Sequence, residues 1–203
     1  MKFVSSAVVL GFVIVFSYFA YYTSAIVFGQ EGWAFLADTL PFFLGGIVAG
    51  TFVIAAVMLN KNFLVKEIES SHIEALTSIL IKMGAKLKIN KNSIQIMPAK
   101  SLNGIKIHTA PYPGFPTDLQ AQIMVLMTKA EGVSTIKENI FENRFMHVSE
   151  LRRLGAKIET AGNMAKIYGK SKLTGAELMA TDLRASVCLV LAGLVSPNKT
   201  IVN

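Results

Sequence analysis

Two aspartates occupy equivalent positions in similar sequence contexts, Asp118 in the string TDLQAQ and Asp182 in the string TDLRAS. Each precedes an apolar segment that is typical of a buried helix. An aspartate at this position commonly caps the helix, because its carboxylate accepts hydrogen bonds from the first free backbone amides. The same carboxylate stays ionised beside the positive helix end and can orient a substrate hydroxyl. Both interpretations remain open for both residues.

Two arginines accompany these acids: Arg184 follows Asp182 by two residues, and Arg144 lies in the string FENRFMHV. A guanidinium group matches carboxylate and phosphate oxygens with paired hydrogen bonds, so both are candidate clamps for an anionic substrate. Surface salt bridges are the alternative for each. His147, three residues after Arg144, is the one histidine close to this group in sequence.

Residues 109–118, with the sequence TAPYPGFPTD, place three prolines within six positions just before Asp118. Proline restricts φ, and a stiff loop loses less entropy when it holds a ligand. A simple connection between a strand and a helix is the alternative. The stretch before Asp182 has no such insertion, which favours a binding role for the loop.

The chain has one cysteine, Cys188, and three widely spaced histidines. One cysteine cannot form an internal disulfide, and the histidines lack partners at metal-ligand spacing. We therefore expect no disulfide scaffold, no metal ion and no cofactor. Cys188 lies in an apolar helical segment, where a small buried side chain is expected instead of a reactive thiolate.

An internal repeat provides the elements that must position these residues. Residues 49–67, 121–139 and 185–203 align without gaps, each as an apolar helix, a polar turn and a short strand. Residues 80–96 and 151–167 match as a helix end, a Gly-Ala turn and two short strands. The repeated unit is helix, strand, helix, strand, strand, strand, present about twice, which predicts an α/β (α+β) fold.

The first 60 residues have a different composition from the remainder. Residues 3–28 carry no charge, a run longer than the roughly 20 helical residues that cross a bilayer core. We predict an uncleaved transmembrane helix there. Residues 39–59 form a second uncharged run, either a second span or a buried helix of the repeat. We favour the buried helix, because the copies of this segment belong to a charged, soluble context.

The remaining 143 residues hold 19 Lys and Arg against 11 Asp and Glu, a net charge of +8. Nucleic-acid binding is disfavoured, since basic and aromatic residues are not interleaved and no groove-reading helix stands out. The excess positive charge suits anionic substrates or anionic lipid headgroups.

Five strings together resemble UDP-N-acetylglucosamine 1-carboxyvinyltransferase, the enolpyruvyl transferase family of peptidoglycan synthesis. They are TAPYPGFPTDLQAQ (109–122), AEG (130–132), FENRFMHVSELRRLGA (141–156), LTGA (173–176) and ATDLRAS (180–186). The resemblance covers about residues 49–203. It implies two domains of repeated βαβαββ units, each an inside-out α/β barrel with helices inside and sheets outside, of which this chain would hold a part.

The resemblance also implies the substrates and the residues that handle them. In that family the 3′-hydroxyl of UDP-N-acetylglucosamine attacks C2 of phosphoenolpyruvate, and phosphate then leaves. Asp118 would be the base near the sugar hydroxyl and a substrate ligand, and Ile140 a backbone contact to the nucleotide sugar. Three further residues would form part of the charged cleft that handles phosphoenolpyruvate: Arg144, Asp182 and Arg184.

Several motifs of that family have no counterpart here, including its catalytic cysteine loop, and LGGIV at 44–48 stands where an acidic motif is expected. We therefore expect a hydrophobic region over 1–46 and a partial transferase domain over 47–203, inactive without a complementing chain. The alternative is a membrane-attached binding module without catalysis. In both cases we expect membrane association through residues 3–28, with the soluble domain in the bacterial cytoplasm.

Overall fold

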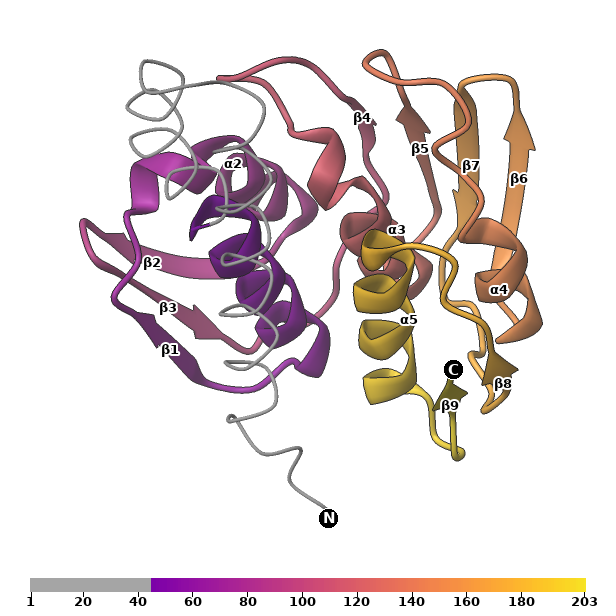
Figure 1. Ribbon diagram of the computed structural model, residues 1–203. Coiled ribbons are helices and arrows are strands. Elements are labelled where there is room, and N and C mark those ends of the chain that lie inside the picture. The colour runs from indigo at the N-terminus through magenta and orange to yellow at the C-terminus, as the bar shows by residue number, and fades with distance from the viewer. Residues whose placement is uncertain (1–44) are drawn as a thin grey trace, which may run out of the picture. The chain divides into compact units, whose positions relative to one another are not determined.

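Helices and short strands alternate along residues 45–203, the part of the chain that the computed structural model describes (Figure 1). The first helix is described over residues 45–59. The elements that follow are β1 (Phe63–Lys66), the 3₁₀ turn η1 (Ser70–Ile73), α2 (Glu74–Met83), β2 (Lys86–Asn90), β3 (Ser93–Met97), β4 (Lys106–His108), η2 (Thr117–Leu119), α3 (Gln120–Lys129), β5 (Val133–Lys137), α4 (Val148–Arg153), β6 (Lys157–Ala161), β7 (Met164–Tyr168), β8 (Glu177–Leu178), α5 (Leu183–Val195) and β9 (Ile201–Val202). This order confirms the predicted unit, twice in full and then as a helix and a strand.

The two hairpins of the repeat have the same register. Lys86 pairs with Met97 between β2 and β3, and Lys157 pairs with Tyr168 between β6 and β7. Both members of the pair are shifted by 71 positions, and the remaining pairs of the two hairpins follow the same shift. The repeat is therefore present in the structure as well as in the sequence.

The gapless alignment is wrong by one residue at the strand after the first helix. It equates Phe63 with Thr135, but the pairings Phe63–Ile96 and Ser134–Ile167 make Ser134 the structural equivalent. The hydrophobic pattern fixes which face of a strand is buried, whereas the length of the preceding turn is set by backbone geometry that the pattern does not contain.

The sheets combine strands from neighbouring copies of the repeat. β4, the last strand of the first copy, pairs in parallel with β5 of the second, and β5 continues to β7 and β6 in a four-stranded sheet. β8 and β9 pair in the same way, and β1, β3 and β2 form a separate sheet. Because β4 and β5 are parallel, their carboxyl ends lie at one edge, and both lead into the candidate site.

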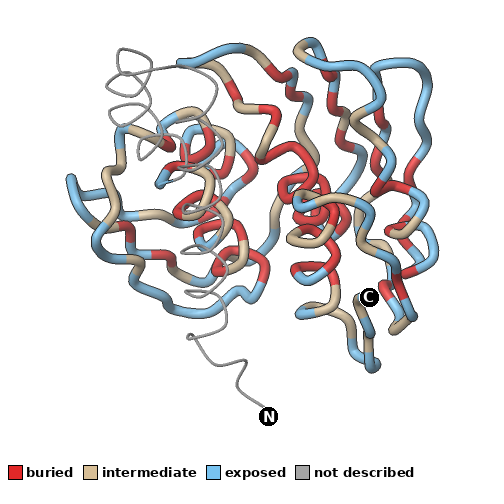
Figure 2. The backbone as a smooth tube through the Cα atoms, viewed as in Figure 1, coloured by how far each residue is buried: buried red, intermediate tan, exposed pale blue. Residues whose placement is uncertain are grey.

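Helix α3 forms the centre of the core, and the helix over 45–59 and α5 each pack into that core through one side. The helix over 45–59, α3 and α5 lie between the three-stranded and four-stranded sheets (Figure 1), and α3 is buried on almost every side (Figure 2). The predicted α/β fold is confirmed. Within residues 45–203 the strands make three separate sheets and do not close into a barrel.

Residues 45–59, the described part of the second apolar run, form a helix that packs into the core, as the favoured interpretation expects. Val53 and Ile54 are completely buried in the common core, together with Met58. None of the helices in residues 45–203 combines the length and hydropathy needed to traverse a bilayer. The predicted transmembrane helix at 3–28 lies outside the described residues.

Candidate active site

Asp118 lies in the middle of η2, the single turn that leads into α3. Its carboxylate does not cap that helix; instead Oδ1 lies 3.8 Å from Nη1 of Arg144. The Asp118 side chain is 42% exposed. The carboxylate is thus accessible and is held by a single ion pair within the described residues, as a base for an incoming hydroxyl would be.

Asp182, the equivalent residue before α5, is a helix cap. Its Oδ1 accepts hydrogen bonds from the backbone amides of Arg184 and Ala185, at 2.8 and 2.9 Å. Burial raises the pKa of Asp182, but these hydrogen bonds and the Arg184 charge outweigh it and hold the pKa below its usual range. The capping interpretation is therefore confirmed for Asp182 and wrong for Asp118.

Arg144 is fixed by two neighbours. Besides the ion pair with Asp118, its guanidinium lies 4.2 Å from the centre of the Phe141 ring. A guanidinium stacked on an aromatic face keeps its edge donors available for anions. Arg144 is therefore oriented while its charge remains balanced by one exposed carboxylate.

Arg184 lies in the first turn of α5, with Nη2 3.8 Å from Oδ2 of Asp182. Its Nη1 is buried and has no hydrogen-bond partner among residues 45–203. A buried guanidinium donor without an acceptor is costly, and a bound anion would satisfy it. The amino-terminal end of α5 adds positive potential at the same place.

His147 is the residue directly before α4 and is almost completely buried. Burial and, to a smaller extent, the Arg184 charge lower its pKa, Asp182 partly opposes them, and the net result is a pKa of about 4. The imidazole is therefore neutral at pH 7. The sequence placed His147 close to the site, and its electrostatic coupling to Arg184 and Asp182 agrees with that placement.

Glu138 is a site-adjacent residue that the sequence interpretation missed. It follows β5 directly, is 3% exposed, and binds both ends of the proline-rich loop through Thr109 and Thr117. It also accepts a 2.8 Å hydrogen bond from the backbone amide of Ile140. The Ile140 carbonyl accepts no hydrogen bond within residues 45–203, so that oxygen remains available. An acidic residue directly after a buried strand was the only signal in the sequence.

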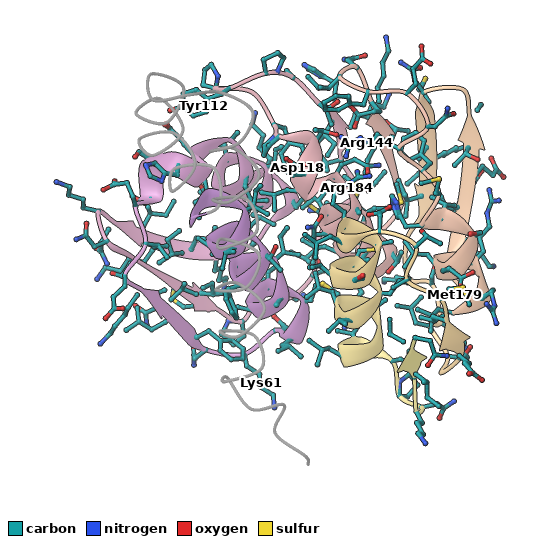
Figure 3. The ribbon with its side chains drawn as sticks, in the orientation of Figure 1. Lys61, Tyr112, Asp118, Arg144, Met179 and Arg184 are labelled. Atoms are coloured by element: carbon teal, nitrogen blue, oxygen red, sulfur yellow. The ribbon has the colours of Figure 1, made fainter. Side chains whose placement is uncertain are left out.

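These residues gather where α3 and α5 begin, and Figure 3 places Asp118, Arg144 and Arg184 beside one another in its view. An exposed carboxylate paired with one guanidinium group can accept a proton from a hydroxyl, and a second guanidinium group at a helix amino terminus can bind an anion. This is the chemistry that adding an alcohol to an anionic substrate requires.

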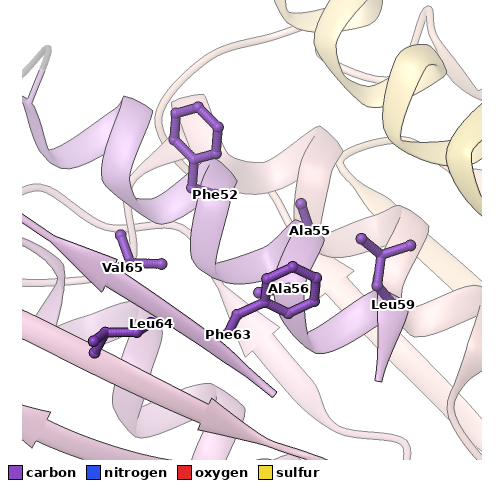
Figure 4. Close-up of a pocket in the computed structure, with 7 residues that line it drawn as sticks. All are labelled: Phe52, Ala55, Ala56, Leu59, Phe63, Leu64 and Val65. Atoms are coloured by element: carbon purple, nitrogen blue, oxygen red, sulfur yellow. The ribbon is translucent and has the colours of Figure 1, made fainter. Parts of the chain in front are cut away.

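Two other features do not belong to this chemistry. Cys188 is completely buried, its Sγ lies 3.2 Å from the Ala185 carbonyl oxygen, and burial raises its thiol pKa, as expected for a structural cysteine. An open pocket of about 320 Å³ between the helix over 45–59 and β1 is lined by apolar side chains alone (Figure 4). Within residues 45–203, no three His, Cys, Asp or Glu side chains are grouped as metal ligands would be.

The chain is similar to curated proteins described as UDP-N-acetylglucosamine 1-carboxyvinyltransferase. The protein of Pelagibacter ubique (strain HTCC1062) is 54% identical over 157 residues, which cover 77% of this chain and 38% of that protein. The protein of Geotalea uraniireducens (strain Rf4) is 51% identical over 154 residues, 76% of this chain and 37% of that protein. The chain therefore spans less than half the length of these relatives.

Solved structures agree with the fold. The enolpyruvyl transferase NikO from Streptomyces tendae matches with a TM-score of 0.73 and 25% identity, over 78% of this chain and 38% of that chain. EPSP synthase from Acinetobacter baumannii matches with a TM-score of 0.56 and 14% identity, over 77% of this chain and 38% of that chain. Residues 46–203 match the sequence model of EPSP synthase (3-phosphoshikimate 1-carboxyvinyltransferase), and the chain belongs to that family.

Proposed function

We propose that residues 47–203 are the sugar-facing part of an enolpyruvyl transferase, one that moves the enolpyruvyl group of phosphoenolpyruvate to the 3′-hydroxyl of UDP-N-acetylglucosamine in peptidoglycan synthesis. The observation that carries the proposal is the uncapped, exposed carboxylate of Asp118 paired with Arg144. Relatives of that description at about 50% identity support the choice of substrates.

In the proposed reaction, Asp118 accepts the proton of the 3′-hydroxyl while the oxygen attacks C2 of phosphoenolpyruvate. Addition also requires a proton at C3, which an acid on a complementing chain would supply. Loss of a C3 proton from the tetrahedral intermediate then releases phosphate and leaves the enol ether. Arg184, with the free donor Nη1, and Arg144 would hold the carboxylate and phosphate groups. Asp182 would orient Arg184, and the Ile140 carbonyl would contact the nucleotide sugar.

Because the chain spans 38% of the Pelagibacter ubique relative, we propose that the chain without a partner binds UDP-N-acetylglucosamine but needs a complementing chain for turnover. Its partners would be the two substrates and that chain, with no nucleic acid, and the domain over 47–203 would work in the bacterial cytoplasm. The domain would be one part of an inside-out α/β barrel that further repeat units complete.

Calorimetry with UDP-N-acetylglucosamine and a phosphate-release assay would test the proposal. The chain alone should bind the sugar nucleotide without releasing phosphate from phosphoenolpyruvate. Adding the remaining part of the Pelagibacter ubique relative should start phosphate release. Absence of sugar-nucleotide binding, both with and without that part, would eliminate the proposal.

The second candidate is a membrane-attached binding module without catalysis, favoured by the uncharged run at 3–28 and the net charge of +8 after residue 60. Fractionation of the native host distinguishes the two. Recovery of the whole protein in the soluble fraction at low salt would remove this candidate, and retention in membranes after a high-salt wash would support it.

A further inference from the structure

The buried carboxylate of Glu138 accepts hydrogen bonds from four donors. Oε1 accepts from the Thr109 hydroxyl at 2.6 Å and from the amides of Ile140 and Phe141 at 2.8 and 3.3 Å. Oε2 accepts from the Thr117 hydroxyl at 2.8 Å. Both oxygens are therefore satisfied, as a buried ionised carboxylate requires.

Glu138 and its donors belong to three segments, which meet because β4 and β5 are parallel. Thr109 directly follows β4, Thr117 begins η2, and Glu138 directly follows β5. Thr109 also donates its amide to the Lys137 carbonyl at 2.9 Å, and its hydroxyl accepts from the Asn139 amide at 2.9 Å. One carboxylate thus closes the base of the proline-rich loop.

The third copy of the repeat indicates what this carboxylate adds. There, Thr181-Asp182 corresponds to Thr117-Asp118, but no insertion precedes it and the acid is fixed by capping α5. In the second copy Asp118 makes no cap, and its neighbour Thr117 is hydrogen-bonded to Glu138 instead. In place of a cap, the second copy has the hydrogen bonds of Glu138 to the two ends of the loop, here called the tie, and these leave the Asp118 carboxylate available.

The charge of Glu138 is consistent with this arrangement. Burial raises its pKa, but the hydrogen bonds from Thr109, Ile140, Thr117 and Phe141 together outweigh burial and hold the pKa below its usual range. The group is ionised at neutral pH, and hydrogen bonds to an ionised acceptor are stronger than neutral ones.

We propose that Glu138 is a positioning residue for the sugar-nucleotide site: through Thr117 it places Asp118, and through the Phe141 amide, which shares a planar peptide unit with the Ile140 carbonyl, it directs that carbonyl toward the ligand. This inference rests on the proposed function, because it takes UDP-N-acetylglucosamine as the ligand. Glu138 itself contacts neither substrate.

Glu138→Gln in the full chain tests the tie, with Glu131→Gln as the matched control. Glu131 precedes the same strand at its opposite end and forms an exposed ion pair with Lys170. A glutamine has one acceptor oxygen, so at least one of the donors loses its partner. In E138Q we expect hydrogen exchange at the Ile140 and Phe141 amides to accelerate roughly tenfold, and the Kd for UDP-N-acetylglucosamine to rise roughly tenfold. E131Q should alter neither.

Thr117→Val separates the two arms of the tie, because it removes the bond to Oε2 alone. The Kd should rise while the Ile140 and Phe141 amides keep their protection. Two outcomes would overturn the inference. One is unchanged hydrogen exchange in E138Q; the other is faster exchange in E138Q while the Kd for UDP-N-acetylglucosamine is unchanged in both E138Q and Thr117→Val. A wild-type chain that binds no sugar nucleotide would overturn the proposed function and the ligand part of the inference. In that case the exchange data would still decide whether Glu138 holds the two segments.

Discussion

The guanidinium of Arg144 lies 3.8 Å from the carboxylate of Asp118, and Arg184 lies at the same separation from Asp182. The two aspartates occupy equivalent positions of the repeat, whereas the arginines do not, because Gln120 stands at the position equivalent to Arg184. The two acids also differ in what else they do. Asp182 is occupied as the cap of α5, whereas Asp118 caps nothing. One copy has therefore kept a structural acid and the other has an acid that is free for chemistry.

Asp118→Asn should change function more than stability. The ion pair with Arg144 involves an exposed carboxylate, so screening by solvent limits its contribution to the free energy of unfolding to about 1 kcal/mol or less. The Kd for UDP-N-acetylglucosamine should rise roughly tenfold, because the amide no longer accepts a charge-assisted hydrogen bond. Urea unfolding and calorimetry on the same sample measure both quantities. Unchanged affinity would contradict the role assigned to Asp118.

Asp182→Ala, unlike Asp118→Asn, should clearly reduce the stability of the fold. Loss of the cap of α5 should lower the free energy of unfolding by about 1 kcal/mol. Asp182→Ser, which can still accept from the Ala185 amide, should recover most of that loss. Chemical denaturation of the three proteins gives the comparison, and equal stability of wild type and D182A would show that the cap contributes nothing.

His147 should make stability depend on pH between about 6.5 and 4. Its pKa in the folded protein is lowered to about 4 from 6.5, so in this range the unfolded chain binds a proton that the folded chain does not. Stability should therefore fall as the pH falls, by up to about 3 kcal/mol across the window. Urea midpoints at a series of pH values should show this slope. His147→Gln, which does not titrate, should reduce it, and an unchanged slope in that variant would assign it to other groups.

Cys188 should be unreactive in the folded chain. The thiol is completely buried and burial raises its pKa, so little thiolate is present near neutral pH. A thiol-modifying reagent should label it slowly under native conditions and rapidly in denaturant. Rapid native labelling would indicate that α5 opens at this point.

Much of this architecture could be predicted from the sequence because the repeat has a clear hydrophobic period. The order of elements and the burial of the helix over 45–59 follow from the repeat, and a cap is one of the two interpretations that the sequence allows for Asp182. Glu138 could not be found in that way. Its partner Thr109 lies 29 positions away, and the two meet only because β4 and β5 pair in parallel. The different roles of Asp118 and Asp182 likewise depend on an insertion whose path is set by tertiary hydrogen bonds.

The parallel pairing of β4 with β5 also means that the repeat is not a separable module. The last strand of one copy completes the sheet of the next, so a cut inside the loop at 110–116 would leave β4 and β5 on different pieces. Each piece would expose a strand edge that the other must cover. The cooperative folding unit therefore overlaps the boundary between two sequence copies, and engineering by exchange of whole copies should cut within the units instead of between them.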